Sequence, residues 1–295
     1  MKPYWVHAGL GAALLLGLAA PEAWACAEGI EVRFAPERPG QGSVVLVEVR
    51  AKAPLEGLRG QWGGETVLFW SDTEAGGPLR ALIGVDLSRL PGKALLKLTA
   101  ERGGEPIECG VILPVAKTEF AVERLRVAKR FVELSEEDEE RAKREGERLR
   151  EILAVVSPVR LWTGGFVLPV EKVKASGNFG KRRILNSQPR SPHAGEDFPA
   201  PAGAPVRAAQ RGRVALAEDL FFSGQTVVLD HGLGLFTYYA HLKKIEVTEG
   251  EVVEAGAVVG RVGATGRVTG AHLHWAARLN QARVNPLDLL AVASE

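Results

Sequence analysis

The sequence predicts an all-β-dominated fold: an N-terminal Ig-like β-sandwich, a connecting helix and a C-terminal antiparallel β domain. Residues 29–127 contain short apolar runs rich in β-branched residues, separated by turns rich in proline and glycine. A charge-dense segment with apolar residues at helical spacing follows. Short apolar runs then return from Ala204 onward, without a long helical period among them. The predicted boundaries divide the chain into an N-terminal segment (1–25), the β-sandwich (26–128), the helical connection (129–158) and the C-terminal β domain (159–292).

The length and charge of the chain narrow its class. With 295 residues it is long enough for two domains. Its formal net charge of +1 gives no reason to expect nucleic acid as a partner. A balanced surface is the simpler interpretation.

Residues 1–25 have the pattern of a secretory signal peptide. Lys2 precedes an apolar run from Ala8 to Ala20, and small residues at Ala23 and Ala25 form a cleavage pattern. Cleavage after Ala27 and a retained anchor are the alternatives. Because the run is short for a membrane span, we expect an exported protein of the periplasm or cell envelope, with no stable membrane span after cleavage.

The two cysteines, Cys26 and Cys109, are an even number in a chain expected to be exported, which favours a disulfide. Lipid modification of Cys26 is the alternative. The residues before it, Ala23-Trp24-Ala25, lack the leucine of a lipoprotein signal.

The strands of the expected sandwich correspond to six apolar runs: IEVRF, SVVLVEVRA, TVLFW, ALIGVDL, ALLKLTA and CGVILPV. Trp62 and Trp70 fall within or beside these runs. Aromatic residues at strand spacing usually belong to the core, and a sugar-binding platform is the alternative.

A helix is predicted to join the two domains. Ser135 and Asp138 are spaced as in a capping box, and Pro158 ends the pattern. Its acidic and basic residues alternate, with pairs such as Glu140 and Arg144, so we expect a solvated face. The apolar stripe of this helix consists of Leu149, Ile152, Leu153 and Val156.

The candidate site comes from the histidines, five of which lie between residues 193 and 274. A catalytic zinc site keeps three protein ligands and one open position, which His193, Asp197 and one histidine of the His272/His274 pair would supply. His272 and His274 project from one face if they lie on a strand, but spacing alone leaves their roles open.

Two nearby residues are expected to stand outside this site. His231, in the turn LDHGLG, is expected to satisfy backbone groups of that turn. Glu196 alternates with Asp197 in an extended segment and should point away from it. Neither residue is therefore a candidate ligand.

The motifs HAGED, YAHL and HLH, in this order and within a glycine-rich framework, resemble the lysostaphin/LytM-type zinc metallopeptidases that cut peptidoglycan cross-bridges. The resemblance covers roughly residues 165–290. It implies that His193, Asp197 and His274 bind zinc and that His241 and His272 are the catalytic pair beside the metal-bound water. Ala271 stands where the family often has proline.

The approach to the first ligand, SGNFGKRR, is similar to the version found in endopeptidases of Gram-negative-type envelopes. Four basic residues here meet either substrate carboxylates or local acidic partners: Lys181, Arg182, Arg183 and Arg190.

The resemblance implies a zinc-dependent endopeptidase that hydrolyses peptide cross-links of peptidoglycan, with stem peptides and a regulatory protein as partners. A non-catalytic LytM-like regulator of another hydrolase is the alternative. Two histidines and a carboxylate also suit iron, and the resemblance favours zinc. Residues 247–263 resemble biotinyl and lipoyl carriers, but the hairpin tip has Glu251, Glu254 and Ala255 in place of a lysine.

Overall fold

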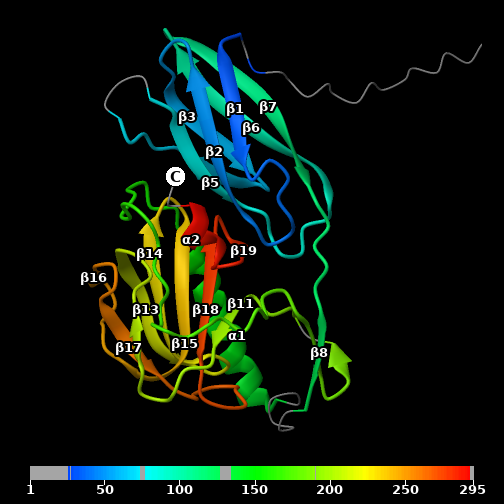
Figure 1. The fold of residues 1–295 in the computed structure, drawn as a ribbon, viewed down its shortest axis with the longest axis vertical. Helices are drawn as coiled ribbons and strands as arrows, with labels where there is room; N and C mark the ends of the chain where they lie inside the picture. The colour runs from blue at the N-terminus through cyan, green and yellow to red at the C-terminus, as the bar shows by residue number, and fades with distance from the viewer. Residues whose placement is uncertain (1–25, 27, 74–76, 127–133, 190, 293–295) are drawn as a thin grey trace, which may run out of the picture.

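In a computed structural model of the protein, residues 26, 28–73, 77–126, 134–189 and 191–292 are described. Two β units are stacked along the long axis, and the chain passes from one to the other along one side (Figure 1). Antiparallel strands predominate, which confirms the predicted fold class. Within the described part of the chain, neither helix combines the length and the apolarity needed to cross a membrane. The expected signal peptide and Arg190 lie outside the described residues.

The N-terminal unit consists of two antiparallel sheets. The three-stranded sheet has the order β1-β2-β5, with β1 at Ile30–Ala35, β2 at Val44–Ala51 and β5 at Leu79–Gly84. The four-stranded sheet has the order β4-β3-β6-β7, with β3 at Glu56–Trp62, β4 at Glu65–Leu68, β6 at Gly92–Arg102 and β7 at Glu105–Val115.

Residues that alternate along these strands form one shared core, as the period of two predicts. Trp62 belongs to this core, where its Nε1 donates to the carbonyl of Gly84 at 2.7 Å, so it offers no sugar platform. A disulfide joins Cys26 to Cys109, which confirms that prediction and leaves no Cys26 thiol for a lipid. It connects the start of the unit to β7, unlike the B–F bridge of antibody domains, so the Ig-like assignment stays a prediction.

The chain leaves the sandwich through β8 (Val122–Leu125), which pairs in parallel with β9 (Arg182–Leu185); β10 (Gln188–Pro189) completes this small sheet. Parallel neighbours need a crossover connection, which here contains α1 (Glu136–Leu153).

The C-terminal unit is a nine-stranded antiparallel sheet with the main order β11-β18-β15-β14-β13-β16. In addition, β17 pairs with β12 and β15, and β19 pairs with β18. The strands are β11 (Gly195–Phe198), β12 (Pro205–Arg207), β13 (Gly212–Leu220), β14 (Gly224–Gly232), β15 (Leu235–Ile245), β16 (Val252–Val253), β17 (Val258–Val262), β18 (Leu273–Leu279) and β19 (Ala282–Val284).

Strand β18 separates the core from the functional face of this sheet. Leu273, Trp275, Ala277 and Leu279 point into the main core. The residues between them, His274, Ala276 and Arg278, line a groove on the opposite face. The short helix α2 (Asp288–Val292) follows β19.

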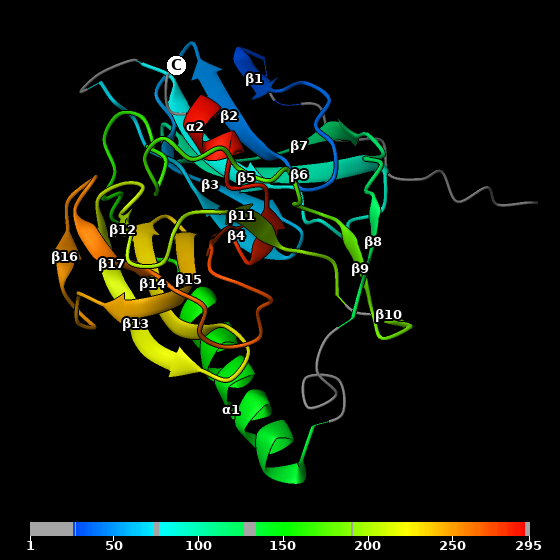
Figure 2. The ribbon, with the colours of Figure 1, turned by 60° about the horizontal axis from the view of Figure 1, so that its bottom comes forward.

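Helix α1 packs against the groove side of the same sheet (Figure 2). Leu149, Ile152 and Leu153 contact Leu216, Leu220, Val228 and Phe236. The Ser135 side chain accepts from the Asp138 amide, and Arg144 pairs with Glu140, as predicted. We expected the charged residues of this helix to face solvent only, but Arg148 forms ion pairs with Glu218 and Glu249 of the C-terminal unit.

The predicted end of this helix was wrong. It ends at Leu153, so Val156 is not part of the apolar stripe. The amide of Leu233 donates to the Ser157 carbonyl at 2.7 Å, and the Ser157 hydroxyl bonds to Asp230. These contacts with β14 and the turn after it draw the chain away from the helix axis.

The two units contact each other through polar and aromatic pairs. Arg283 of β19 donates to both carboxylate oxygens of Asp86 at 3.1 and 2.8 Å, and Trp70 packs edge-on against Trp162 with 5.6 Å between ring centroids. The Asp288 carboxylate accepts from the Val44 amide at 3.1 Å. The sandwich is thus docked beside β18 and β19.

Candidate metal centre

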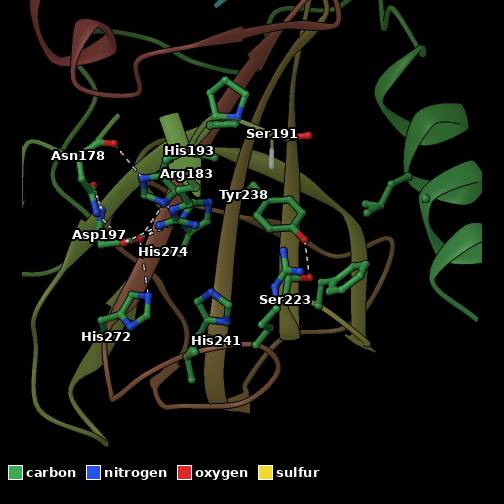
Figure 3. Close-up of a pocket in the computed structure, with 18 of the residues that line it drawn as sticks. Asn178, Arg183, Ser191, His193, Asp197, Ser223, Tyr238, His241, His272 and His274 are labelled. Atoms are coloured by element: carbon green, nitrogen blue, oxygen red, sulfur yellow. Dashed lines mark hydrogen bonds and ion pairs between the residues drawn. The ribbon is translucent and has the colours of Figure 1, made fainter. Parts of the chain in front are cut away.

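Three side chains from separate parts of the sequence converge on one point (Figure 3). Asp197 of β11 and His274 of β18 are direct cross-strand partners, and His193 lies just before β11. The Asp197 Oδ1 atom is 3.2 Å from His193 Nε2 and 2.9 Å from His274 Nδ1, and the two nitrogens are 2.9 Å apart. The structure therefore brings together the three ligands that the motifs predicted.

The donor set fits a zinc ion. Zinc holds histidine nitrogens and carboxylate oxygens at about 2.0 to 2.2 Å, so tetrahedral ligand atoms lie about 3.3 Å apart. The observed separations of 2.9 to 3.2 Å are close to this spacing. Two imidazole nitrogens and one carboxylate are also a typical ligand set of catalytic zinc.

Asn178 holds two of the ligands in place. Its carbonyl oxygen is 3.1 Å from His193 Nδ1, and because a carbonyl only accepts, Nδ1 carries the hydrogen and Nε2 presents a lone pair to the site. Its side-chain nitrogen donates to Asp197 Oδ2 at 2.7 Å. Such outer contacts fix the tautomer and the orientation of metal ligands.

Glu196 in turn holds the Asn178 loop. It is 2% exposed, and its carboxylate accepts from the amides of Asn178 and Phe179, each at 3.1 Å. It stands outside the ligand set, as predicted, but its supporting contact was missed. The sequence around Glu196 gives no sign of this contact.

Gly195 makes room for the third ligand. A Cβ atom at this position would lie 2.7 Å from His274 Cε1 and 2.6 Å from the Trp275 carbonyl oxygen. The carbonyl oxygen is fixed by the pairing of β11 with β18, and the imidazole cannot turn aside without leaving the ligand cluster. The glycine in HAGED is therefore required by the imidazole of His274.

His241 lies where β15 changes partner. Ala240 pairs with β18, whereas Leu242 pairs with β17, and His241 between them has a left-handed φ of 62°. Its Nδ1 donates to the Thr265 carbonyl at 2.9 Å, which leaves a lone pair on Nε2. Burial, with the nearby rings of His274 and His272, lowers the pKa of His241 to about 3, so its ring is neutral at neutral pH.

His272 stands beside His241, with 4.9 Å between their ring centroids. Its Nδ1 donates to the Gly270 carbonyl at 2.9 Å, and its Nε2 lies 3.6 Å from Asp197 Oδ1. Both predicted catalytic histidines thus border the ligand cluster with Nε2 available.

The electrostatics of the cluster favour a bound cation. Burial raises the pKa of Asp197, but the adjacent imidazoles of His193 and His274 outweigh this effect and hold that pKa well below its ordinary value. Burial lowers the pKa of His274 to about 4 despite its contact with Asp197. At neutral pH the site therefore offers one carboxylate and a neutral His274 ring, as a metal requires.

The cluster opens into a groove of about 1070 Å³. One wall is α1, which contributes Gly146, Leu149, Arg150 and Leu153. Arg183 lies on the opposite side, 3.4 Å from Glu123 and 3.7 Å from Asp197 Oδ2. Of the four basic residues considered above, Arg183 is the one that lines the groove within the described residues.

His231 lies outside the groove and is fully buried. Its Nδ1 is bonded to the Arg211 carbonyl at 2.8 Å and its Nε2 to the Thr237 hydroxyl at 2.7 Å. It is structural, as expected, although its carbonyl partner comes from a neighbouring strand segment and not from its own turn.

Comparison with known proteins agrees with this geometry. The model of peptidase family M23 matches residues 191–286. DD-carboxypeptidase/endopeptidase Mpg of Neisseria meningitidis is 39% identical over 127 residues, which are 43% of this chain and 29% of that protein. Peptidoglycan DD-endopeptidase ShyA of Vibrio cholerae is 42% identical over 109 residues, 36% of this chain and 25% of ShyA. The chain thus spans less than a third of each of these relatives.

A crystal structure of a Pseudomonas aeruginosa protein assigned to peptidase M23 extends the likeness to both β units. It is 31% identical, and the alignment covers 88% of this chain and 96% of that one with a TM-score of 0.67. Together with the clustered motifs, this similarity shows that the chain belongs to peptidase family M23.

Proposed function

We propose that the protein is a zinc-dependent endopeptidase that hydrolyses peptide cross-links of peptidoglycan. The observation that carries this proposal is the convergence of His193, Asp197 and His274 beside two further histidines at the end of a groove. Relatives named as peptidoglycan DD-endopeptidases support a substrate of this class and a cross-link between stem peptides.

His193, Asp197 and His274 would hold the zinc ion, with Asn178 keeping two of them in orientation. Bound zinc lowers the pKa of a water molecule toward about 7 and polarises the scissile carbonyl. The groove beside it accommodates the peptide on both sides of the cleaved bond.

His241 and His272 handle the protons. In each ring Nδ1 donates a hydrogen bond to a backbone carbonyl, which leaves Nε2 with a lone pair. One of the two histidines therefore takes a proton from water through Nε2. The pair then stabilises the oxyanion and returns a proton to the leaving amine. Glu196, the glutamate beside Asp197, is not placed as a base, since its carboxylate is turned toward the Asn178 loop.

The rest of the assignment belongs to the same proposal. Residues 1–25 direct export to the periplasm or cell envelope, residues 26–128 form a separate domain, and residues 159–292 form the peptidase domain. A regulatory protein partner would act through the sandwich or α1. A purely regulatory LytM-like role is not favoured, because such a role does not require a complete ligand set.

The test combines metal content with activity. Wild type is expected to hold about one zinc per chain and to release peptide fragments from purified sacculi, whereas Asp197→Ala should lose both, since one of three ligands is gone. Asp219→Ala removes a 63% exposed carboxylate from β13 and serves as the matched control. A wild-type protein that holds zinc but leaves sacculi and muropeptide dimers uncut would refute the proposed activity.

A further inference from the structure

Arg278 lies on the groove face of β18, in line with the metal ligands. Alternation along the strand places His274, Ala276 and Arg278 on this face, and all three line the groove. Four residues at about 3.3 Å each separate the backbones of His274 and Arg278 by about 13 Å. The arginine therefore stands at a fixed distance from the proposed reaction centre.

The guanidinium of Arg278 forms no ion pair with any carboxylate of the described residues. Its Nη1 is 3.5 Å from the Ala277 carbonyl oxygen, which is beyond the range of a good hydrogen bond. Asp86, the acid whose charge acts on Arg278, is held by Arg283, the direct cross-strand partner of Arg278. Arg278 and Arg283 are thus neighbours across the two strands, and the Asp86 carboxylate pairs with Arg283.

Among the residues that the structure describes, the groove lining carries more positive than negative charge. The charged side chains are five arginines and two carboxylates: Arg126, Arg150, Arg183, Arg267 and Arg278, with Glu123 and Asp197. Both carboxylates are engaged, Glu123 by Arg183 and Asp197 by the histidine cluster. The lining thus favours an anionic ligand.

We propose that Arg278 is a specificity residue that binds a carboxylate of an acidic peptide lying in the groove. This inference rests on the proposed function and names the chemistry of the substrate. An extended peptide also advances about 3.3 Å per residue, so the bound carboxylate lies about three to four residues from the cleaved amide. The planar guanidinium binds a carboxylate in a bidentate way, which fixes the register of the peptide.

The state of the guanidinium is compatible with this role. Burial, followed by the nearby charge of Arg283, lowers the pKa of Arg278 to about 10, and the group stays a cation at neutral pH. A partly buried cation with no carboxylate partner among the described residues gains most from a ligand that brings one.

The experiment measures binding of a cross-linked tetrapeptide dimer and of the same dimer with its carboxylates amidated. Zinc-loaded His241→Ala serves as the host, because it is expected to bind without cleaving. We expect amidation to weaken binding about 10- to 100-fold in this host. In His241→Ala/Arg278→Gln both dimers should bind equally weakly, and Arg278→Lys should restore part of the preference.

Arg261→Gln in the same host is the matched control, since Arg261 pairs with Glu246 outside the groove. Zinc content and melting temperature show whether each variant is folded. A preference for the acidic dimer that falls less than about threefold in Arg278→Gln overturns the inference. Failure of wild type to cleave any dimer would instead count against the proposed function, while the binding preference would still report on Arg278.

Discussion

The two ends of the groove differ in how the chain treats its polar side chains. At the metal end, a hydrogen bond with the surrounding protein orients each of four side chains: His193, Asp197, His241 and His272. At the other end, Arg278 has no carboxylate of the described residues as a partner. The side chains at the metal end are therefore oriented before a ligand binds, whereas Arg278 obtains a carboxylate partner only from the ligand.

This difference teaches how the two ends divide catalysis and recognition. Catalytic groups need fixed geometry, which hydrogen bonds from the surrounding protein provide. A recognition group that already had its own carboxylate would have to break that pair to bind a substrate. Arg283 illustrates the second case, because its bidentate contact with Asp86 joins the two β units and leaves it unavailable.

The largest expected effect is at the metal end. His241→Ala should lower kcat on a muropeptide dimer by about 10²- to 10⁴-fold, because a general acid-base group is removed. Zinc content should stay at the wild-type level, since His241 is not among the three candidate ligands. Mass spectrometry of released fragments and metal analysis measure both quantities. Activity within about tenfold of wild type would contradict its role as a proton carrier.

Glu196→Gln tests whether the metal end depends on its outer support. Glutamine offers one uncharged acceptor oxygen in place of the two carboxylate oxygens, so one of the amides that donate to Glu196 would lose its acceptor and the Asn178 loop should loosen. We expect zinc to bind about 10- to 100-fold more weakly, as is typical for such supporting contacts. Competition with a chelator measures the affinity. The preference for acidic dimers should persist at saturating zinc, and its loss would mean that the two ends are not separate.

Asp86→Asn tests how much the ion pair between Asp86 and Arg283 stabilises the protein. Hydrogen bonds to charged groups contribute about 1.5 to 3 kcal/mol, so we expect the unfolding free energy to fall by about 1 to 2 kcal/mol at neutral pH. Burial raises the pKa of Asp86, but contacts with Arg283 and Ser88 outweigh it and lower that pKa well below 3.8. The stability from this pair is therefore present above about pH 4 and lost as the pH falls further.

Denaturant unfolding at pH 7 and pH 3 measures this effect. The difference between wild type and Asp86→Asn should shrink at the lower pH. Glu246→Gln breaks an exposed pair with Arg261 and should have little effect at either pH. An equal difference at both values of pH would show that the carboxylate is not what stabilises the contact.

The smallest expected effect comes from the helical wall of the groove. Gly146 lies in α1, where a Cβ would meet only the Arg150 side chain at 4.0 Å. Gly146→Ala should raise the unfolding free energy by about 0.5 to 1 kcal/mol, since alanine favours the helix. It should also raise KM a few-fold by narrowing the groove. An unchanged KM would show that the peptide does not approach this wall.

The convergence of His193, Asp197 and one histidine of the His272/His274 pair could be predicted, because these residues lie in short motifs and an extended strand places every second residue on one face. Strand alternation left the roles of His272 and His274 open, and the choice of His274 came from the resemblance of HAGED, YAHL and HLH to a known family. The supporting contacts could not be predicted, since Asn178 and Glu196 meet across a loop whose course depends on the whole sheet. The end of α1 was misplaced for the same reason, because Ser157 is drawn to Asp230, 73 residues away in sequence.

Arg278 shows a further limit of the sequence. The alternation that leads from His272 and His274 also places Arg278 on the groove face. The sequence could not show that Arg278 lacks a carboxylate partner among the described residues. That depends on the pairing of Asp86 with Arg283, 197 residues away in sequence. Local patterns predict which way a side chain points, whereas the absence of a partner is a property of the folded molecule.

The parallel pairing of β8 with β9 has a practical consequence for shortening the chain. The crossover between them contains α1, so a fragment starting at the predicted boundary, residue 159, would lack both β8 and that helix. It would expose the apolar patch formed by Leu216, Leu220, Val228 and Phe236, and such a patch promotes aggregation. A soluble catalytic fragment should therefore begin upstream of Val122.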